Sequence, residues 1–186
     1  MSEFDRQKWE ARYSGGRGYG REPDPFLSEI AHLLPQAGKA LDVAGGTGRH
    51  ARWLAARGLD VTLADISAAG LAEGARLAAE AGLRITTREV DLDDAFPEGP
   101  WDVVLVSFFL VRPHLEALVA SMASGGRLVL IHPTRRNLER HEKPTERWLL
   151  EDGELDSGIP GLTTLFHEEG WTDRGRHEVH YVGAKP

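Results

Sequence analysis

The chain has 186 residues, no cysteine and a formal net charge of −7. The lack of cysteine excludes disulfides, cysteine-ligated metals and a thiol nucleophile, and the negative charge disfavours nucleic acid as a main partner because phosphate binding requires a positive surface. Hydrophobic residues make up 41% of the sequence, with no long apolar run and no signal-like start. We therefore expect a single cytoplasmic domain spanning residues 1–186, without membrane contact.

Residues 1–38 are expected to form a helical cap. Phe4, Trp9 and Tyr13 recur at helical spacing, a glycine-rich loop follows at residues 14–20, and a second helix is predicted over residues 25–34. Aromatic residues at this spacing more often serve packing than ligand contact. If the domain has a site, however, this segment is its natural cover.

Residues 39–132 alternate between strand and helix patterns. Strands are predicted at residues 40–44, 59–64, 83–90, 101–107 and 127–131, and helices at residues 49–57, 67–81 and 111–123. Ser67 is the expected N-cap of the second of these helices. Alternation with short turns predicts a parallel, doubly wound α/β sheet.

Residues 133–186 follow a different pattern. A polar stretch leads to a short helix near residues 146–155, and two further strands are predicted at residues 162–167 and 177–182, joined by a glycine- and charge-rich segment. We expect these strands to lie antiparallel at the sheet edge. The predicted fold is thus Rossmann-like α/β, with a seven-stranded, mostly parallel sheet.

The first strand runs into a glycine turn, and the second ends in a carboxylate. Gly45, Gly46 and Gly48 let a ligand approach the backbone, and the free N–H groups of the next helix point into the turn. Asp65 is well placed to accept both hydroxyls of a ribose. The pattern predicts a site for a nucleoside-containing cofactor.

Two cofactor classes fit these glycines. Gly46, Gly48 and Ala51 followed by Asp65 match the fingerprint of nicotinamide and flavin enzymes. Asp42 favours a different cofactor, because a negative charge inside the strand before the turn gains nothing from a pyrophosphate. It would instead hold a cationic group.

The segment Leu41-Asp-Val-Ala-Gly-Gly-Thr-Gly-Arg49 resembles motif I of class I S-adenosylmethionine (SAM) methyltransferases. The resemblance implies that SAM is the cofactor and S-adenosylhomocysteine (SAH) the product, and that Asp42 holds the methionine amino group beside the glycines. Ala44 replaces the first glycine of the motif. We expect it to keep a negative φ, with the flexibility moved to Gly45.

The same resemblance implies further contacts at the strand ends. Asp65 and Ile66 would meet the ribose, and Asp91 and Leu92 the adenine. Ser107 ends the fourth strand and either lines the floor beneath the reactive methyl group or is a buried serine bonded to backbone.

Trp9, Tyr13, the glycine loop and the sequence Pro-Asp-Pro-Phe-Leu at residues 23–27 resemble the cap of small methyltransferases of the tellurite-resistance type. That resemblance implies that Trp9, Tyr13 and Tyr19 close over cofactor and acceptor. Residues 148–155 and 168–171 resemble the same group.

We therefore expect methyl transfer to a small-molecule acceptor by in-line displacement, in a monomer or homodimer. The alternatives are a nicotinamide-dependent oxidoreductase and a non-catalytic SAM-binding regulatory module. His114, His132 and Tyr19 are the candidate catalytic groups. Three basic loop residues either grip an anionic acceptor or balance neighbouring glutamates: Arg112, Arg135 and Arg136. The histidine spacing predicts no metal site.

Overall fold

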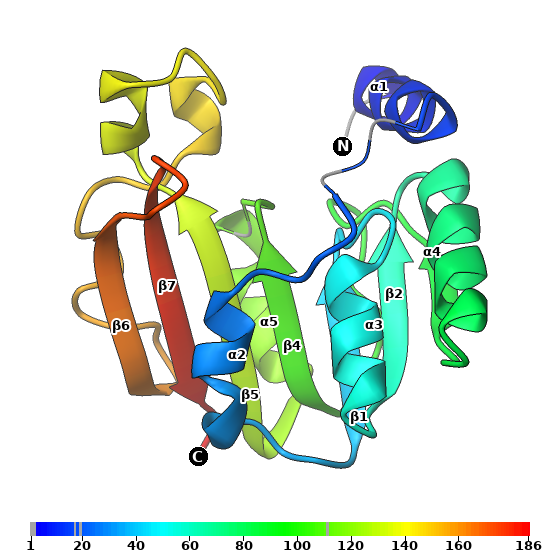
Figure 1. Cartoon of the computed structure of the whole chain (residues 1–186). Helices are drawn as coiled ribbons and strands as arrows, with labels where there is room; N and C mark the ends of the chain where they lie inside the picture. The colour runs from blue at the N-terminus through cyan, green and yellow to red at the C-terminus, as the bar shows by residue number, and fades with distance from the viewer. Residues whose placement is uncertain (1–2, 17, 19, 111) are drawn as a thin grey trace.

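The computed structural model describes residues 3–16, 18, 20–110 and 112–186. Its centre is a seven-stranded sheet of order β3-β2-β1-β4-β5-β7-β6 (Figure 1). The strands are β1 (Lys39–Val43), β2 (Asp60–Asp65), β3 (Thr86–Glu89), β4 (Trp101–Ser107), β5 (Met122–Pro133), β6 (Thr163–Trp171) and β7 (His177–Ala184). Strand β7 is antiparallel to both neighbours, and the pairings from β3 to β5 are parallel. The predicted sheet is confirmed.

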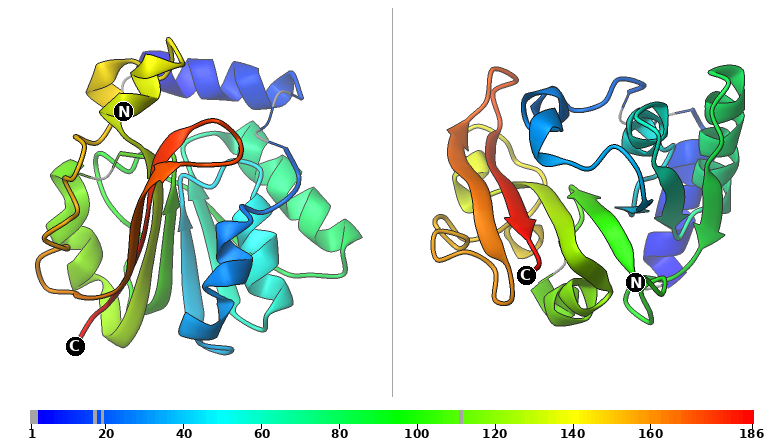
Figure 2. Two further views of the ribbon diagram at one scale, coloured as in Figure 1. Left: turned by 60° about the vertical axis from the view of Figure 1, so that its left-hand side comes forward. Right: turned by 90° about the horizontal axis from the view of Figure 1, so that it is seen from below.

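Helices lie on both faces of this sheet. They are α1 (Glu3–Ser14), α2 (Phe26–Glu29), α3 (Arg49–Ala56), α4 (Ala68–Glu80) and α5 (Leu115–Ala120), with 3₁₀ turns η1 (Ala31–Leu33), η2 (Arg112–His114), η3 (Arg135–Glu139) and η4 (Glu146–Trp148). Figures 1 and 2 show α2 and α3 on one face and α5 on the other. Helix α1 lies beyond the carboxyl ends of the parallel strands, next to α4.

The central strands are buried on both faces, so their successive residues supply two cores. Ala40 and Val103 belong to the core that contains Phe26 of α2 and Leu54 of α3. The residues that follow them in β1 and β4 belong to the core that contains Leu118 of α5. This is the two-residue period of a strand in a covered parallel sheet.

Two predicted helices are shorter than expected. The helix over residues 25–34 is divided at Ile30 into α2 and η1. Phe26, Leu27, Ile30 and Leu34 are still buried, and Leu33 is half-buried. The helix over residues 111–123 ends at Ala120, because Met122 pairs with Trp101 and already belongs to β5. The pairing of Met122 with β4 therefore decided where this helix ends, although the apolar residues beyond Ala120 have helical spacing.

The prediction of a helix near residues 146–155 was wrong. After η4 the chain is extended at Leu149 and Leu150, which are buried in succession, and Leu150 forms a bridge to Thr134. Residues 152–157 then form turns. Adjacent buried leucines suit an extended segment better than a helix face. Strand β6 also continues to Trp171 through residues expected to form a loop, whereas β3 is shorter than predicted.

No helix in the described ranges is both long and apolar enough to cross a bilayer.

Candidate functional site

A cavity lies at the carboxyl ends of β1, β2 and β4, with α1 contributing to its wall. It is lined by Trp9, Tyr13, Asp42, Ala44, Gly45, Thr47, Arg49, His50, Asp65, Ile66, Ser107, Phe108 and Phe109. The lining includes most of the residues that the sequence assigned to the cofactor. Carboxyl ends of parallel strands are where open α/β sheets bind ligands.

The glycine turn after β1 is shaped by two different needs. Ala44 has φ +52°, so the expectation of a negative φ at this position is wrong, and an alanine carries the left-handed conformation. Gly45 is required for space instead, because a Cβ there would lie 2.5 Å from a carboxylate oxygen of Asp42. Gly46 and Gly48 adopt the left-handed conformation, with φ values of +56° and +67°, and Gly48 is the N-cap residue of α3.

Asp42 is a buried carboxylate with one oxygen unused by the protein. It is 1% exposed, and its Oδ2 accepts a hydrogen bond of 2.9 Å from the backbone N–H of Ala51 in α3. Its Oδ1 is buried and has no hydrogen-bond partner in the described part of the chain. Burial raises the pKa of Asp42 to about 7, against the smaller opposing effect of the Ala51 N–H. A cationic ligand group would satisfy this oxygen.

Asp65 joins the glycine turn to the start of α4. One oxygen accepts from the Ser67 N–H at 2.9 Å and the other from the Gly46 N–H at 2.8 Å. Burial raises the pKa of Asp65, and these two N–H groups oppose that rise. Each carboxylate oxygen retains acceptor capacity, so the side chain can position the turn and accept ligand hydroxyls. Ser67 caps α4 as predicted, with its Oγ accepting from Gly70 N.

Two more unpaired polar atoms belong to residues that line the cavity. His50 Nε2 and Ser107 Oγ are buried and have no hydrogen-bond partner within the described residues. Burial and the neighbouring Arg49 lower the pKa of His50 to about 3, which keeps its imidazole neutral. Buried polar groups are normally hydrogen-bonded, so these atoms indicate ligand contacts.

Sequence reasoning assigned no role to four of the lining residues. Arg49 and His50 directly follow the last glycine of the turn, and Phe108 and Phe109 directly follow the end of β4. The position of these pairs at strand and turn ends was the available signal. Phe108 has φ +57°, which bends the chain at the cavity floor.

Helix α1 is fastened over the site by its polar face. The Glu10 carboxylate accepts a hydrogen bond of 2.6 Å from Ser67 Oγ and another of 3.1 Å from Ala69 N, at the start of α4. Trp9 and Tyr13 stack with ring centroids 5.8 Å apart. Tyr13 lies so close to Gly46 that a side chain there would overlap its hydroxyl.

The space left beneath α1 is small. The cavity volume is about 70 Å³, whereas pockets for small molecules typically hold about 300–1,000 Å³. A nucleoside therefore requires the aromatic side chains of α1 to move outward.

The remaining predicted residues lie elsewhere. Leu92 is fully buried in the core, and Asp91 accepts from Asp93 N at 3.0 Å; neither lines the cavity. His114 pairs with Asp93 at 3.1 Å. His132 is hydrogen-bonded at 2.9 Å to the Trp148 carbonyl, and burial lowers its pKa to about 4. Tyr19 lies outside the described residues.

The three loop arginines are engaged by acids. Arg112 pairs with Glu154, Arg135 with Glu146 and Glu151, and Arg136 with Glu139. The cations near the cavity come from other positions: Arg49 lines it, and Arg176 lies 5.0 Å from the ring centroid of Phe108.

Residues 40–125 match the family model of the methyltransferase domain. This segment is a methyltransferase domain. It contains the glycine turn, Asp42, Asp65 and Ser107, so the cavity is formed largely by the domain itself and closed by α1. A comparison with curated proteins finds no match.

Solved structures share the fold of the methyltransferase domain. TehB from Haemophilus influenzae is 17% identical, with 96% of this chain and 67% of TehB covered and a TM-score of 0.75. The N-methyltransferase NodS from Bradyrhizobium japonicum, in complex with SAH, is 15% identical, with 97% of each chain covered and a TM-score of 0.71. The [4+2]-cyclase SpnF is 18% identical, with 87% of this chain and 80% of SpnF covered and a TM-score of 0.68.

Proposed function

We propose that this protein transfers a methyl group from SAM to a small-molecule acceptor. The observation that carries the proposal is Asp42, which lines the cavity of a methyltransferase domain and whose buried Oδ1 has no hydrogen-bond partner among the described residues. An ammonium group would complete its hydrogen bonding and favour its ionised form. A diphosphate would face two buried carboxylates, Asp42 and Asp65, and be repelled.

The chemical groups of the cavity residues match those of SAM. Asp42 would hold the methionine amino group, and Asp65 would accept from the ribose hydroxyls. Gly45 lets Asp42 and Leu63 pack closely against the turn, because a side chain there would collide with both. Figure 1 places α1 over the same edge of the sheet, where Trp9 and Tyr13 can cover a ligand after moving aside to admit it.

When bound, SAM supplies a methyl group already activated by its positive sulfur. The chain then has to hold the acceptor in line and exclude water, and such positioning accounts for roughly 7–11 kcal/mol of a barrier. Trp9, Tyr13, Phe108 and Phe109 provide apolar walls for this purpose.

Because Asp42 and Asp65 are assigned to the cofactor in this proposal, the remaining candidate base among the described lining residues is a histidine. His50 is the histidine in the lining, and its pKa of about 3 makes it a weak proton acceptor. Its neutral imidazole is better suited to forming a hydrogen bond than to removing a proton. This favours acceptors that arrive already nucleophilic, such as an anion or a soft chalcogen atom, over amines or alcohols that must first lose a proton.

Two other functions have support of their own. The fold is shared with a cyclase, so a SAM pocket without methyl transfer is one alternative. The glycine fingerprint keeps a nicotinamide-dependent oxidoreductase as the other. Asp42 disfavours that second reading.

Calorimetric titration with SAM, SAH and NAD separates cofactor classes. We expect SAM and SAH to bind and NAD to give no heat. A protein that binds NAD but not SAM would overturn the proposal.

A second assay follows transfer from labelled SAM to thiols, amines and chalcogen oxyanions. SAM binding with no transfer to any of them would favour the non-catalytic module.

A further inference from the structure

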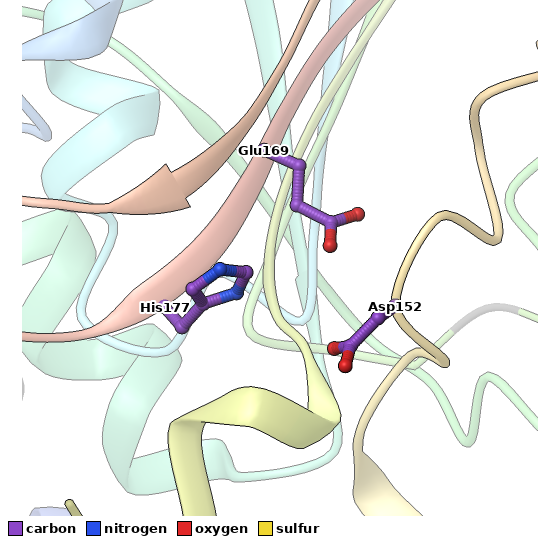
Figure 3. A group of neighbouring side chains, drawn as sticks. All are labelled: Asp152, Glu169 and His177. Carbon is purple, nitrogen blue, oxygen red and sulfur yellow. The ribbon is translucent and has the colours of Figure 1, made fainter. Parts of the chain in front are cut away.

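We propose that Asp152, Glu169 and His177 form a binding site for one divalent transition-metal ion, with Zn²⁺ as the best-fitting probe. Glu169 lies on β6, His177 begins β7, and Asp152 lies in the segment after η4. Their ligand atoms all lie within 4.8 Å of one another, and Figure 3 shows the three side chains turned toward a common point. Because the three come from separate segments, sequence spacing could not reveal the group.

The histidine of this group is buried and fixed. His177 is 3% exposed, and its Nδ1 lies 2.7 Å from the hydroxyl of the fully buried Thr134. A hydrogen bond on one ring nitrogen orients the imidazole and leaves the other nitrogen for a ligand, which is the usual arrangement of metal-binding histidines.

Backbone groups hold both carboxylates in place. Asp152 accepts a hydrogen bond of 3.1 Å from Arg136 N, and Glu169 accepts one of 3.0 Å from Gly153 N. Each carboxylate therefore has one oxygen fixed by the protein. Such outer contacts are the second feature that metal sites share.

The charges of the group are not balanced by the protein. In the described part of the chain, no arginine or lysine forms an ion pair with Asp152 or Glu169, although the backbone N–H of Arg136 contacts Asp152. Arg136 pairs with Glu139 instead, and Arg140 lies over the Trp171 ring at 3.7 Å. Two neighbouring carboxylates without a cation repel each other, and a bound cation removes that cost.

The spacing also fits an ion better than direct contact. No hydrogen bond or ion pair joins His177 to Asp152 or Glu169 among the described residues, so the group is not held together by its own members. Zinc is bound by histidine and carboxylate at about 2.0–2.2 Å in tetrahedral geometry, which places two ligand atoms about 3.4 Å apart. A small inward movement would complete such a site.

A second group shares one member. Asp156, His167 and Glu169 also lie within 4.8 Å of one another, and the buried His167 Nε2 has no hydrogen-bond partner within the described residues. We assign the ion to the first group because its histidine is more deeply buried and its two carboxylates are each fixed by backbone. Glu169 is common to both, so variants at the other positions distinguish them.

The site is separate from the cofactor cavity, whose lining contains none of the three residues. One imidazole and two carboxylates suit Zn²⁺ better than Mg²⁺ or Ca²⁺, which prefer oxygen alone. A bound ion would join the segment that carries Asp152 to the β6–β7 pair.

The test is a competition titration of chelator-treated, untagged protein against a chromophoric zinc indicator. We expect one Zn²⁺ per chain, with Asp152→Asn and Glu169→Gln each weakening the affinity at least about tenfold. The matched control is Glu168→Gln, which alters the exposed neighbour on the same strand and is expected to keep wild-type affinity.

Circular dichroism checks that each variant is folded. His177→Gln is expected to lose the site, and if it does not fold, the exposed Asp152→Asn decides. His167→Gln and Asp156→Asn are expected to retain binding. The proposal is overturned if these two lose the ion while Asp152→Asn keeps it. Equal affinity for Zn²⁺ in the wild type and in Glu169→Gln would mean an adventitious ion only, and would also overturn the proposal.

Discussion

Asp24 and Asp42 are each 1% exposed, yet their pKa values move in opposite directions. Burial raises the pKa of both. In Asp24 this is outweighed by the Arg174 guanidinium and by the N–H of Phe26, so its pKa is lowered. Asp42 has one backbone N–H and no direct cation, and its pKa rises to about 7.

Asp24 is a carboxylate paired within the fold, whereas Asp42 is the carboxylate that we propose for a ligand. Asp24 and Arg174 join the chain just before α2 to the turn between β6 and β7, and their charges are matched within the fold. Asp42 lies inside the methyltransferase domain with an unused oxygen. A buried charge without a partner is costly. In the proposed function, the ammonium group of the ligand supplies the missing cation.

The largest effect is expected from Asp42→Asn. The asparagine oxygen can still accept from Ala51 N, but its amide N–H groups face the ligand ammonium. The affinity for SAM and SAH is expected to fall about ten- to hundredfold, since hydrogen bonds to charged groups contribute about 1.5–3 kcal/mol. Binding of 5′-methylthioadenosine, which lacks the amino acid, serves as the control and is expected to change little. Equal losses for both ligands would contradict the assignment.

The free energy of unfolding of Asp42→Asn, relative to that of the wild type, is expected to increase as the pH rises. The folded pKa of Asp42 lies above its ordinary value of 3.8, so its contribution to folding is fully present below about pH 4 and is lost as the pH rises through 7. Asparagine does not incur that loss. Urea denaturation at pH 5 and pH 8 measures the difference, and a variant that becomes relatively less stable at pH 8 would oppose this account.

Arg174→Ala would turn Asp24 into a second unpaired buried carboxylate. We expect the free energy of unfolding at pH 7 to fall by about 2 kcal/mol, less than for a fully buried pair because Arg174 is 34% exposed. The lowered pKa of Asp24 stabilises the fold above its ordinary pKa, and this contribution is lost as the pH falls through the folded value. The deficit should therefore shrink in acid.

The matched control is Arg136→Ala, which removes an exposed ion pair with Glu139 and is expected to change stability by under about 0.5 kcal/mol. If both arginine variants lose the same stability, burial is not what distinguishes Asp24.

Asp65→Asn distinguishes the two carboxylates of the cavity. Asp65 serves the ribose in this account, so the affinities for SAH and for 5′-methylthioadenosine are both expected to fall by about tenfold. That equal loss contrasts with the selective loss predicted for Asp42→Asn. Calorimetry with the two ligands is the measurement, and unchanged affinity would remove Asp65 from the ribose site.

The smallest effect is expected from Glu10→Gln. Removing the charge weakens the attachment of α1 to the start of α4, where a carboxylate contributes about 0.3–1 kcal/mol. Stopped-flow mixing with SAH is expected to show association a few fold faster, with little change in affinity. Glu3→Gln, at the exposed start of α1, is the control, and identical rates in both variants would argue against α1 as the cover.

The sequence predicted the cofactor half better than the remainder for a physical reason. Around Gly45 and Asp65, turn chemistry and strand ends are local in sequence, so β1, α3 and β2 were placed within about a residue. Residues 146–155 form no regular helix, because Leu149 and Leu150 pack in an extended stretch into a core built by distant segments. Local spacing carries no information about such packing.

The same limit applies to the site. Asp42, Ser107 and Tyr13 follow from motifs and strand ends, whereas His50 acquires its low pKa through burial. The sign of φ at Ala44 was mispredicted because residue preference was weighed without the close approach of Asp42 and Leu63 to the next residue.

Proton release on SAH binding tests the role of Asp42 most directly. At pH 6 an Asp42 with a pKa of about 7 is mostly protonated, and an ammonium group that binds it must expel that proton. Calorimetry in buffers of different ionisation enthalpy is expected to show close to one proton released by the wild type at pH 6, little above pH 8, and none by Asp42→Asn. Equal proton release by the two proteins at pH 6, or none by the wild type, would contradict the account.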